Sequence, residues 1–150
     1  MNEPLSRDPD ALQRHLSEVQ DLLARQRLSE NLTRRQQVPH QDLVETITAK
    51  QDLAWLSRKL ERLHPADIAH ILEALPLGDR RVVWDLVRAD KDGEILLEVS
   101  DAVRASLIER MDPEELKAAA ETLDADELAD LAPDLPPELM REVIESLDRE

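Results

Sequence analysis

Apolar residues recur every 12 residues through the second half of the chain. The series has eight members: Leu63, Leu75, Val87, Val99, Met111, Leu123, Leu135 and Leu147. A second apolar pair follows eight and nine residues after each of the first seven anchors, as Ile71 and Leu72 do after the first. Because 3.6 residues make one helical turn, each unit accommodates a helix of about two turns and a tight corner. The pattern predicts short helices near residues 65–74, 78–86, 90–98, 101–110, 113–122, 125–132 and 137–147.

Helix-start chemistry follows most of the anchors. Asp112-Pro113 and Asp124 are examples, since an Asp side chain can cap free backbone N–H groups and proline suits the first helical turn. Helices this short are marginal alone and must be stabilised by neighbours. We therefore expect an all-α fold in which the short helices stack into an α-solenoid.

Longer helices are predicted before the repeats. An amphipathic stripe of leucine and valine runs through residues 12–28, and Pro39 marks a break before a second helix that starts near residue 41 and must end before Pro65. We expect an N-terminal helical extension at residues 1–40 and the superhelical domain at residues 41–150. The sequence leaves open whether the first helix packs on the repeats or pairs with another chain.

The charge of −15 is concentrated in the repeat half of the chain. Residues 1–62 hold ten Lys/Arg and ten Asp/Glu, whereas residues 111–150 hold three and fourteen. Such an acidic surface repels nucleic acid and anionic lipid and attracts cations or basic proteins. The absence of cysteine excludes disulfides and thiolate metal sites.

Paired acidic residues occupy one helix face in three of the repeat units. Four residues separate the members of each pair, which are Asp90/Glu94, Asp126/Asp130 and Glu138/Glu142. Like charges at this spacing destabilise a helix mildly, and a bound divalent cation would offset that cost. Mg²⁺ takes one or two carboxylates and keeps several waters, which suits open pairs. The alternative is an ordinary solvated helix face.

Other chemistry finds no support in the sequence. Asp90-Lys91-Asp92-Gly93-Glu94 resembles part of a calcium loop, but the repeat continues through it as helix, so we reject an EF-hand. The four histidines lack metal-ligand spacing, and no phosphate-binding glycine loop or nucleophile elbow is present. We expect no enzyme. No apolar stretch is long enough to span a bilayer, so we expect the fragment itself to be soluble, with no direct membrane insertion.

The repeat half resembles the cytosolic N-terminal domain of the MgtE magnesium channel family. The resemblance covers about residues 63–147. It is carried by an ordered series of motifs: Leu63-His64-Pro65-Ala66-Asp67-Ile68-Ala69, Leu72-x-x-Leu75-Pro76, Val82-Val83, Glu94-Ile95-Leu96, Met111-Asp112-Pro113-Glu114-Glu115 and Leu123-Asp124-x-Asp126-Glu127-Leu128-Ala129-Asp130-Leu131.

The resemblance implies a right-handed, armadillo-like superhelix that precedes CBS domains and a transmembrane pore. In that family Mg²⁺ fills acidic sites between the N domain and the CBS domains, and the resulting closure shuts the pore. The matching metal ligands would be Glu94, Asp126 and Asp130. The implied partners are the CBS and transmembrane domains of the same full-length protein, a homodimer at the cytoplasmic face of the cell membrane. Mg²⁺ binding by this chain alone should be weak, and Gly93 should loosen the backbone beside Glu94.

A second interpretation of the sequence requires no metal ion. The helical units also resemble those of the flagellar rotor protein FliG, a protein-docking scaffold. In that reading the acidic face meets a basic partner, and the carboxylate pairs are ordinary surface.

Overall fold

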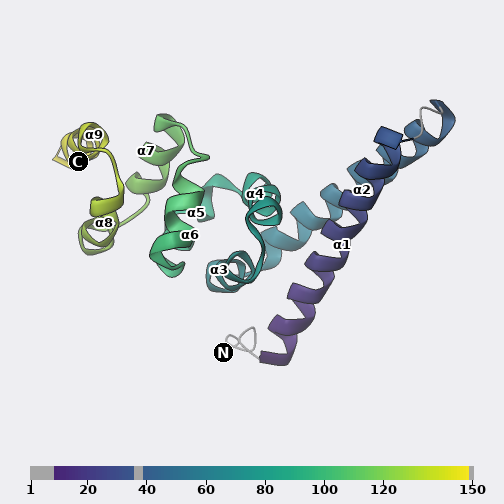
Figure 1. Ribbon diagram of the computed structural model, residues 1–150. Helices are drawn as coiled ribbons and strands as arrows, with labels where there is room; N and C mark the ends of the chain where they lie inside the picture. Colours follow the sequence, from purple (N-terminus) through teal and green to yellow (C-terminus); the bar gives the residue numbers. More distant parts are fainter. Residues whose placement is uncertain (1–8, 36–38, 149–150) are drawn as a thin grey trace. The chain divides into compact units, whose positions relative to one another are not determined.

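The computed structural model describes residues 9–35 and 39–148, and every element of secondary structure within these ranges is helical (Figure 1). This confirms the all-α prediction. The chain divides into two compact units, Met1–His64 and Pro65–Glu150. The domain boundary expected near residue 40 stays a prediction, while the structure groups the second long helix with the first.

The first unit is a hairpin of two long helices. Helix α1 spans Pro9–Arg35 and packs against α2, which spans Pro39–Arg62. Their buried stripes are Leu16, Val19, Leu22 and Leu23 from α1, and Leu56 and Leu60 from α2. The predicted stripe of the first helix therefore faces the second helix of the same chain, with Leu28 left exposed at its end.

The second unit contains short helices at the predicted places. Their bounds are α3 Pro65–Ala74, α4 Leu77–Leu86, α5 Ala89–Glu98, α6 Asp101–Ile108, α7 Pro113–Glu121, α8 Ala125–Leu131 and α9 Pro137–Asp148. A single 3₁₀ turn, η2, follows α8 at Ala132–Asp134. Each predicted boundary is met within about two residues, as is usual for helix ends.

The 12-residue anchors mark the residues where helices end. The backbone N–H of Met111 donates to the Ile108 carbonyl at 3.0 Å, and that of Leu123 donates to the Ala120 carbonyl at 3.1 Å. The anchors are buried from Leu63 to Leu135, apart from the half-buried Val87, and the Leu147 side chain lies outside the described residues. The anchors from Leu63 to Leu135 therefore follow the end of a helix, and all of them except the half-buried Val87 place their side chains in the core.

Helices two places apart in sequence pack on one another. Helix α3 contacts α5, α5 contacts α7, and α7 contacts α9, while α4 contacts α6. The apolar pairs supply these contacts, since Ile71, Leu72, Ile95 and Leu96 are all fully buried. The structural repeat is therefore 24 residues, or two sequence units, and equivalent positions in alternate helices face the same core.

Candidate functional site

Helix α8 presents two of the three predicted ligands. Asp126 and Asp130 lie one turn apart on α8, and both side chains are exposed. A capping box fixes the start of this short helix: the Asp124 carboxylate accepts from the Glu127 N–H at 2.9 Å, and the Asp124 N–H donates to Glu127 Oε1 at 3.0 Å. The local sequence thus holds both carboxylates on a defined helical face.

The third predicted ligand, Glu94, is exposed on α5 beside a point of very close packing. A Cβ atom at Gly93 would lie 2.7 Å from Thr122 Oγ1 and 2.8 Å from the Ala119 carbonyl oxygen. Glycine is therefore required for α5 to approach α7. Gly93 was expected to loosen the backbone at Glu94, and the structure instead gives it a packing role that anchors this part of α5.

The three predicted ligands do not form a closed metal site by themselves. Helices α5 and α8 contact each other, and Glu94, Asp126 and Asp130 make no hydrogen bond or ion pair with another described residue. Among the residues whose side chains the structure describes (10–28, 47 and 49–145), no three His, Asp or Glu side chains converge closely enough to hold a metal ion. These carboxylates are open to solvent and available to ligands from outside the chain.

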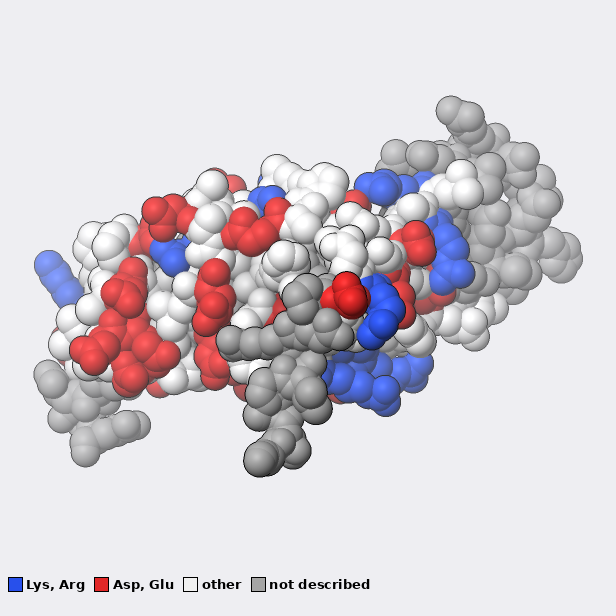
Figure 2. Space-filling model, turned by 90° about the horizontal axis from the view of Figure 1, so that it is seen from below, with Lys and Arg blue, Asp and Glu red and all other residues white. Residues whose placement is uncertain are grey.

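The other acidic pairs have cationic neighbours. Asp90 lies 3.6 Å from Arg88 Nε, and Glu142 lies 3.9 Å from Lys117 Nζ. Figure 2 shows acidic side chains gathered in patches over the part of the second unit that carries the C-terminal helices. Asp126 and Asp130 thus differ from the other pairs in lacking a nearby cation among the described residues.

Asp92 is a buried acid that sequence reasoning did not single out. It is 9% exposed, and it occupies the position in the 24-residue repeat that Ile68 and Leu116 fill in the neighbouring helices. Burial, together with the negative charges of Glu115 and Asp90, raises its pKa from 3.8 to about 7. A comparison of alternate sequence units could have found Asp92, because it places this carboxylate at a position that apolar core residues fill in the other units.

Further acidic side chains near Asp92 lie at the start of α7. A hydrogen bond with Asp112 and burial raise the pKa of Glu115. Asp112 is also the N-cap of α7, accepting from the Glu115 N–H at 2.8 Å. Nearby, Arg110 makes a two-point ion pair with Asp85, so that arginine is already neutralised within the fold. Asp92 and Glu115, and Glu115 and Asp112, are therefore near enough for their negative charges to interact.

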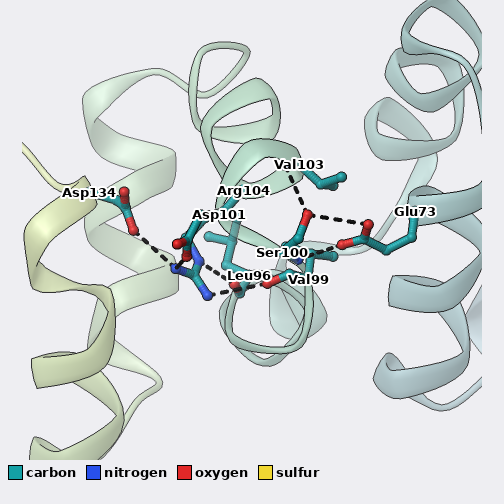
Figure 3. A network of polar contacts seen from close by, with 8 residues as sticks. All are labelled: Glu73, Leu96, Val99, Ser100, Asp101, Val103, Arg104 and Asp134. Atoms are coloured by element: carbon teal, nitrogen blue, oxygen red, sulfur yellow. Dashed lines mark hydrogen bonds and ion pairs between the residues drawn. The ribbon is translucent and has the colours of Figure 1, made fainter.

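Two arginines hold the helix ends, and sequence reasoning missed both. Arg104 on α6 donates to the Leu96 carbonyl at 2.7 Å and to the Val99 carbonyl at 3.3 Å (Figure 3). Arg80, 24 residues earlier, donates in the same way to the carbonyls of Leu72 and Leu75 at 3.0 and 3.1 Å. Their spacing of two sequence units is the signal that could have found them.

The comparison with known protein families identifies the second unit. The family model for the MgtE intracellular N domain matches residues 63–150. The chain belongs to the MgtE intracellular N domain family. The match begins at the first anchor and includes Glu94, Asp126 and Asp130, so the resemblance expected from the sequence is confirmed.

The family match does not extend to the α1–α2 hairpin, which precedes residue 63. No curated protein matches the chain. In the described ranges, no helix is long and apolar enough to cross a membrane. The MgtE N domain belongs to a family of magnesium transporters.

Proposed function

We propose that this chain is the cytosolic regulatory part of an MgtE-type Mg²⁺ channel or transporter. Asp126, Asp130 and Glu94 act as its Mg²⁺-sensing carboxylates. The observation that carries the proposal is that all three are exposed and make no ion pair with a described residue, within a domain of this family.

The missing ligands come from the CBS domains of the same full-length protein. Mg²⁺ prefers six oxygen ligands and keeps several waters, so two or three exposed carboxylates leave room for a second protein surface. The lack of a three-carboxylate group in the described ranges supports weak binding by this chain alone. It also supports a site that is complete only when two domains meet, within a homodimeric full-length protein.

The mechanism is an electrostatic latch. Residues 111–150 hold three basic and fourteen acidic side chains, so this region repels an acidic neighbour at low Mg²⁺. Bridging ions neutralise both surfaces, and closure of the N domain onto the CBS domains shuts the pore. Reciprocal coupling between such sites is typically about 1–3 kcal/mol, or about 5–150-fold in affinity.

The stacked helices serve as the rigid support for this latch. We propose that α3 to α9 wind as a right-handed, armadillo-like superhelix. The contacts of alternate helices support that arrangement. Because each helix leans on its neighbours, the carboxylates of α5 and α8 keep fixed spacing when a second domain approaches.

The test is transport by the full-length protein at controlled cytosolic Mg²⁺. The double variant Asp126→Asn/Asp130→Asn should close only at about 5–150-fold higher Mg²⁺, by the coupling range above. The matched control is the double variant Glu138→Gln/Glu142→Gln, which removes two carboxylates at the same spacing. This variant should close at the same Mg²⁺ concentration as the unchanged protein. Unchanged closure in the α8 double variant would contradict the proposal and favour the metal-independent docking scaffold.

A further inference from the structure

The α1–α2 hairpin leaves large apolar side chains in contact with water. Leu28 is 61% exposed, Ile47 is 49% exposed and Trp55 is 41% exposed. Trp55 also lines an open groove of about 970 Å³, together with Leu22 and other residues of both helices. Of the three exposed side chains only Trp55 lines this groove, and two helices alone bury only one stripe each, so Trp55 gains no full burial within the hairpin.

The groove carries charges of both signs. Arg25 pairs with Asp52 at 3.1 Å across it. Asp21 on α1 and Arg58 on α2 also line the groove, are exposed, and make no hydrogen bond or ion pair with another described residue. An acidic and a basic side chain thus stand on opposite helices without neutralising each other.

This charge pattern fits a second copy of the same surface. A two-fold axis parallel to the two helices would bring the α1 side of one groove to the α2 side of the other, so that Asp21 of each copy would face Arg58 of its neighbour. A uniformly basic or acidic partner would satisfy one of these charges and oppose the other. Residues 1–62 hold ten basic and ten acidic side chains, so two hairpins do not repel, whereas the acidic repeat halves do.

We propose that the hairpin is a self-association surface through which two copies of this chain pair groove to groove. The paired hairpins form a four-helix arrangement with Trp55 near its centre and the Asp21–Arg58 pairs at its edges. Aromatic side chains at the centre of an interface commonly dominate its stability, and edge charges set its register. The proposal is independent of Mg²⁺ sensing and lies outside the residues that the family model matches.

The first test is the mass of the 150-residue chain by sedimentation equilibrium, from low to high micromolar concentration. A dimer should form with rising concentration, and tryptophan emission should shift to shorter wavelength, because Trp84 is already buried and only Trp55 changes environment. Trp55→Ala should weaken the dimer about tenfold or more. Leu77→Ala, at a similarly exposed leucine on α4, should leave the dimer unchanged.

The second test reverses the charges. Asp21→Lys and Arg58→Glu should each weaken self-association, since each places like charges across the two-fold axis. An equimolar mixture of the two variants should associate again, because in that mixed dimer both contacts join opposite charges. This recovery also shows that both variants are folded.

Three outcomes would overturn the proposal. The first is a chain that stays monomeric at every concentration. The second is a mixture that associates no better than either charge variant alone. The third is a loss on Leu77→Ala as large as that on Trp55→Ala, which would assign any dimer to the repeat half.

Discussion

Arg104 on α6 closes the end of α5 through the carbonyl oxygen of Leu96, which accepts from Arg104 Nε at 2.7 Å. The last carbonyls of a helix have no partner within it. The same guanidinium also contacts Asp101 and Asp134, each at 3.1 Å, and the side chain is almost fully buried. One side chain therefore joins α5, α6 and the η2 turn after α8, on which the spacing of the candidate ligands depends.

Loss of this arginine should destabilise the repeat unit strongly. Arg104→Ala leaves buried carbonyls without a donor, so the free energy of unfolding should fall by about 2–3 kcal/mol in a urea titration. Arg104→Lys should retain only part of this stability, because an ammonium group cannot reproduce the planar set of donors of a guanidinium group. Arg81→Ala, an exposed arginine on α4, is the control and should change stability by less than about 0.5 kcal/mol. Equal losses at both positions would contradict the role given to Arg104.

The two glycines should respond oppositely to the same substitution. Gly93→Ala gains helix propensity, but its methyl group meets the Ala119 carbonyl at 2.8 Å, so α5 must move from α7. We expect a net loss of about 1–3 kcal/mol, typical of overpacking. Gly78→Ala on α4 meets nothing within 4 Å and should be neutral or stabilising by up to about 1 kcal/mol. Thermal unfolding of both variants decides this, and a stabilised Gly93→Ala would show that the contact is not tight.

The sequence predicted the helices but not how their side chains meet. Short helices and their ends follow from a 12-residue spacing of apolar anchors with Pro and Asp beside them, which is local information. Arg104 and Asp92 were missed because their roles depend on which helices touch, and the 24-residue structural repeat is not visible in one helix. The packing role of Gly93 was missed for the same reason, because it depends on the close approach of α7 to α5. The candidate ligands were found because acidic pairs four residues apart share a helix face whatever the fold.

Asp92 should make stability depend on pH. Its pKa is raised to about 7 in the fold, so the folded chain binds this proton more tightly than the unfolded chain. Its destabilising effect is full above pH 7, shrinks as the pH falls, and is absent below the ordinary value of 3.8. Asp92→Asn should therefore stabilise the chain at pH 8 by about 2 kcal/mol, since one pKa unit corresponds to about 1.4 kcal/mol and water still reaches the site.

The quantity to measure is the difference in the free energy of unfolding between the Asp92→Asn variant and the unchanged chain. Urea unfolding from pH 8 to pH 5 should show the advantage of Asp92→Asn shrinking as Asp92 becomes protonated. Carboxylates that do not interact with Asp92 act on both proteins alike and cancel in the comparison, whereas those of Glu115 and Asp90 add to the effect of Asp92. Glu98→Gln, at an exposed acid at the other end of the same helix, serves as the control and should give a smaller, flatter difference. An advantage that does not change with pH would assign the effect to packing.

The capping box of α8 should link folding to the proposed Mg²⁺ response. Asp124→Ala removes the acceptor for the Glu127 N–H and should cost about 1 kcal/mol. Because α8 has only 7 residues, this loss should fray its first turn, where Asp126 lies. Hydrogen exchange should show faster exchange of the α8 amides, while those of α3 and α5 stay protected. Asp124→Ser keeps a capping oxygen and should restore most protection.

In the full-length protein, Asp124→Ala should then raise the Mg²⁺ needed for closure by less than Asp126→Asn/Asp130→Asn does, since it disturbs the ligands without removing them. A frayed α8 with a normal Mg²⁺ response would separate the order of this helix from sensing and weaken the assignment of its carboxylates.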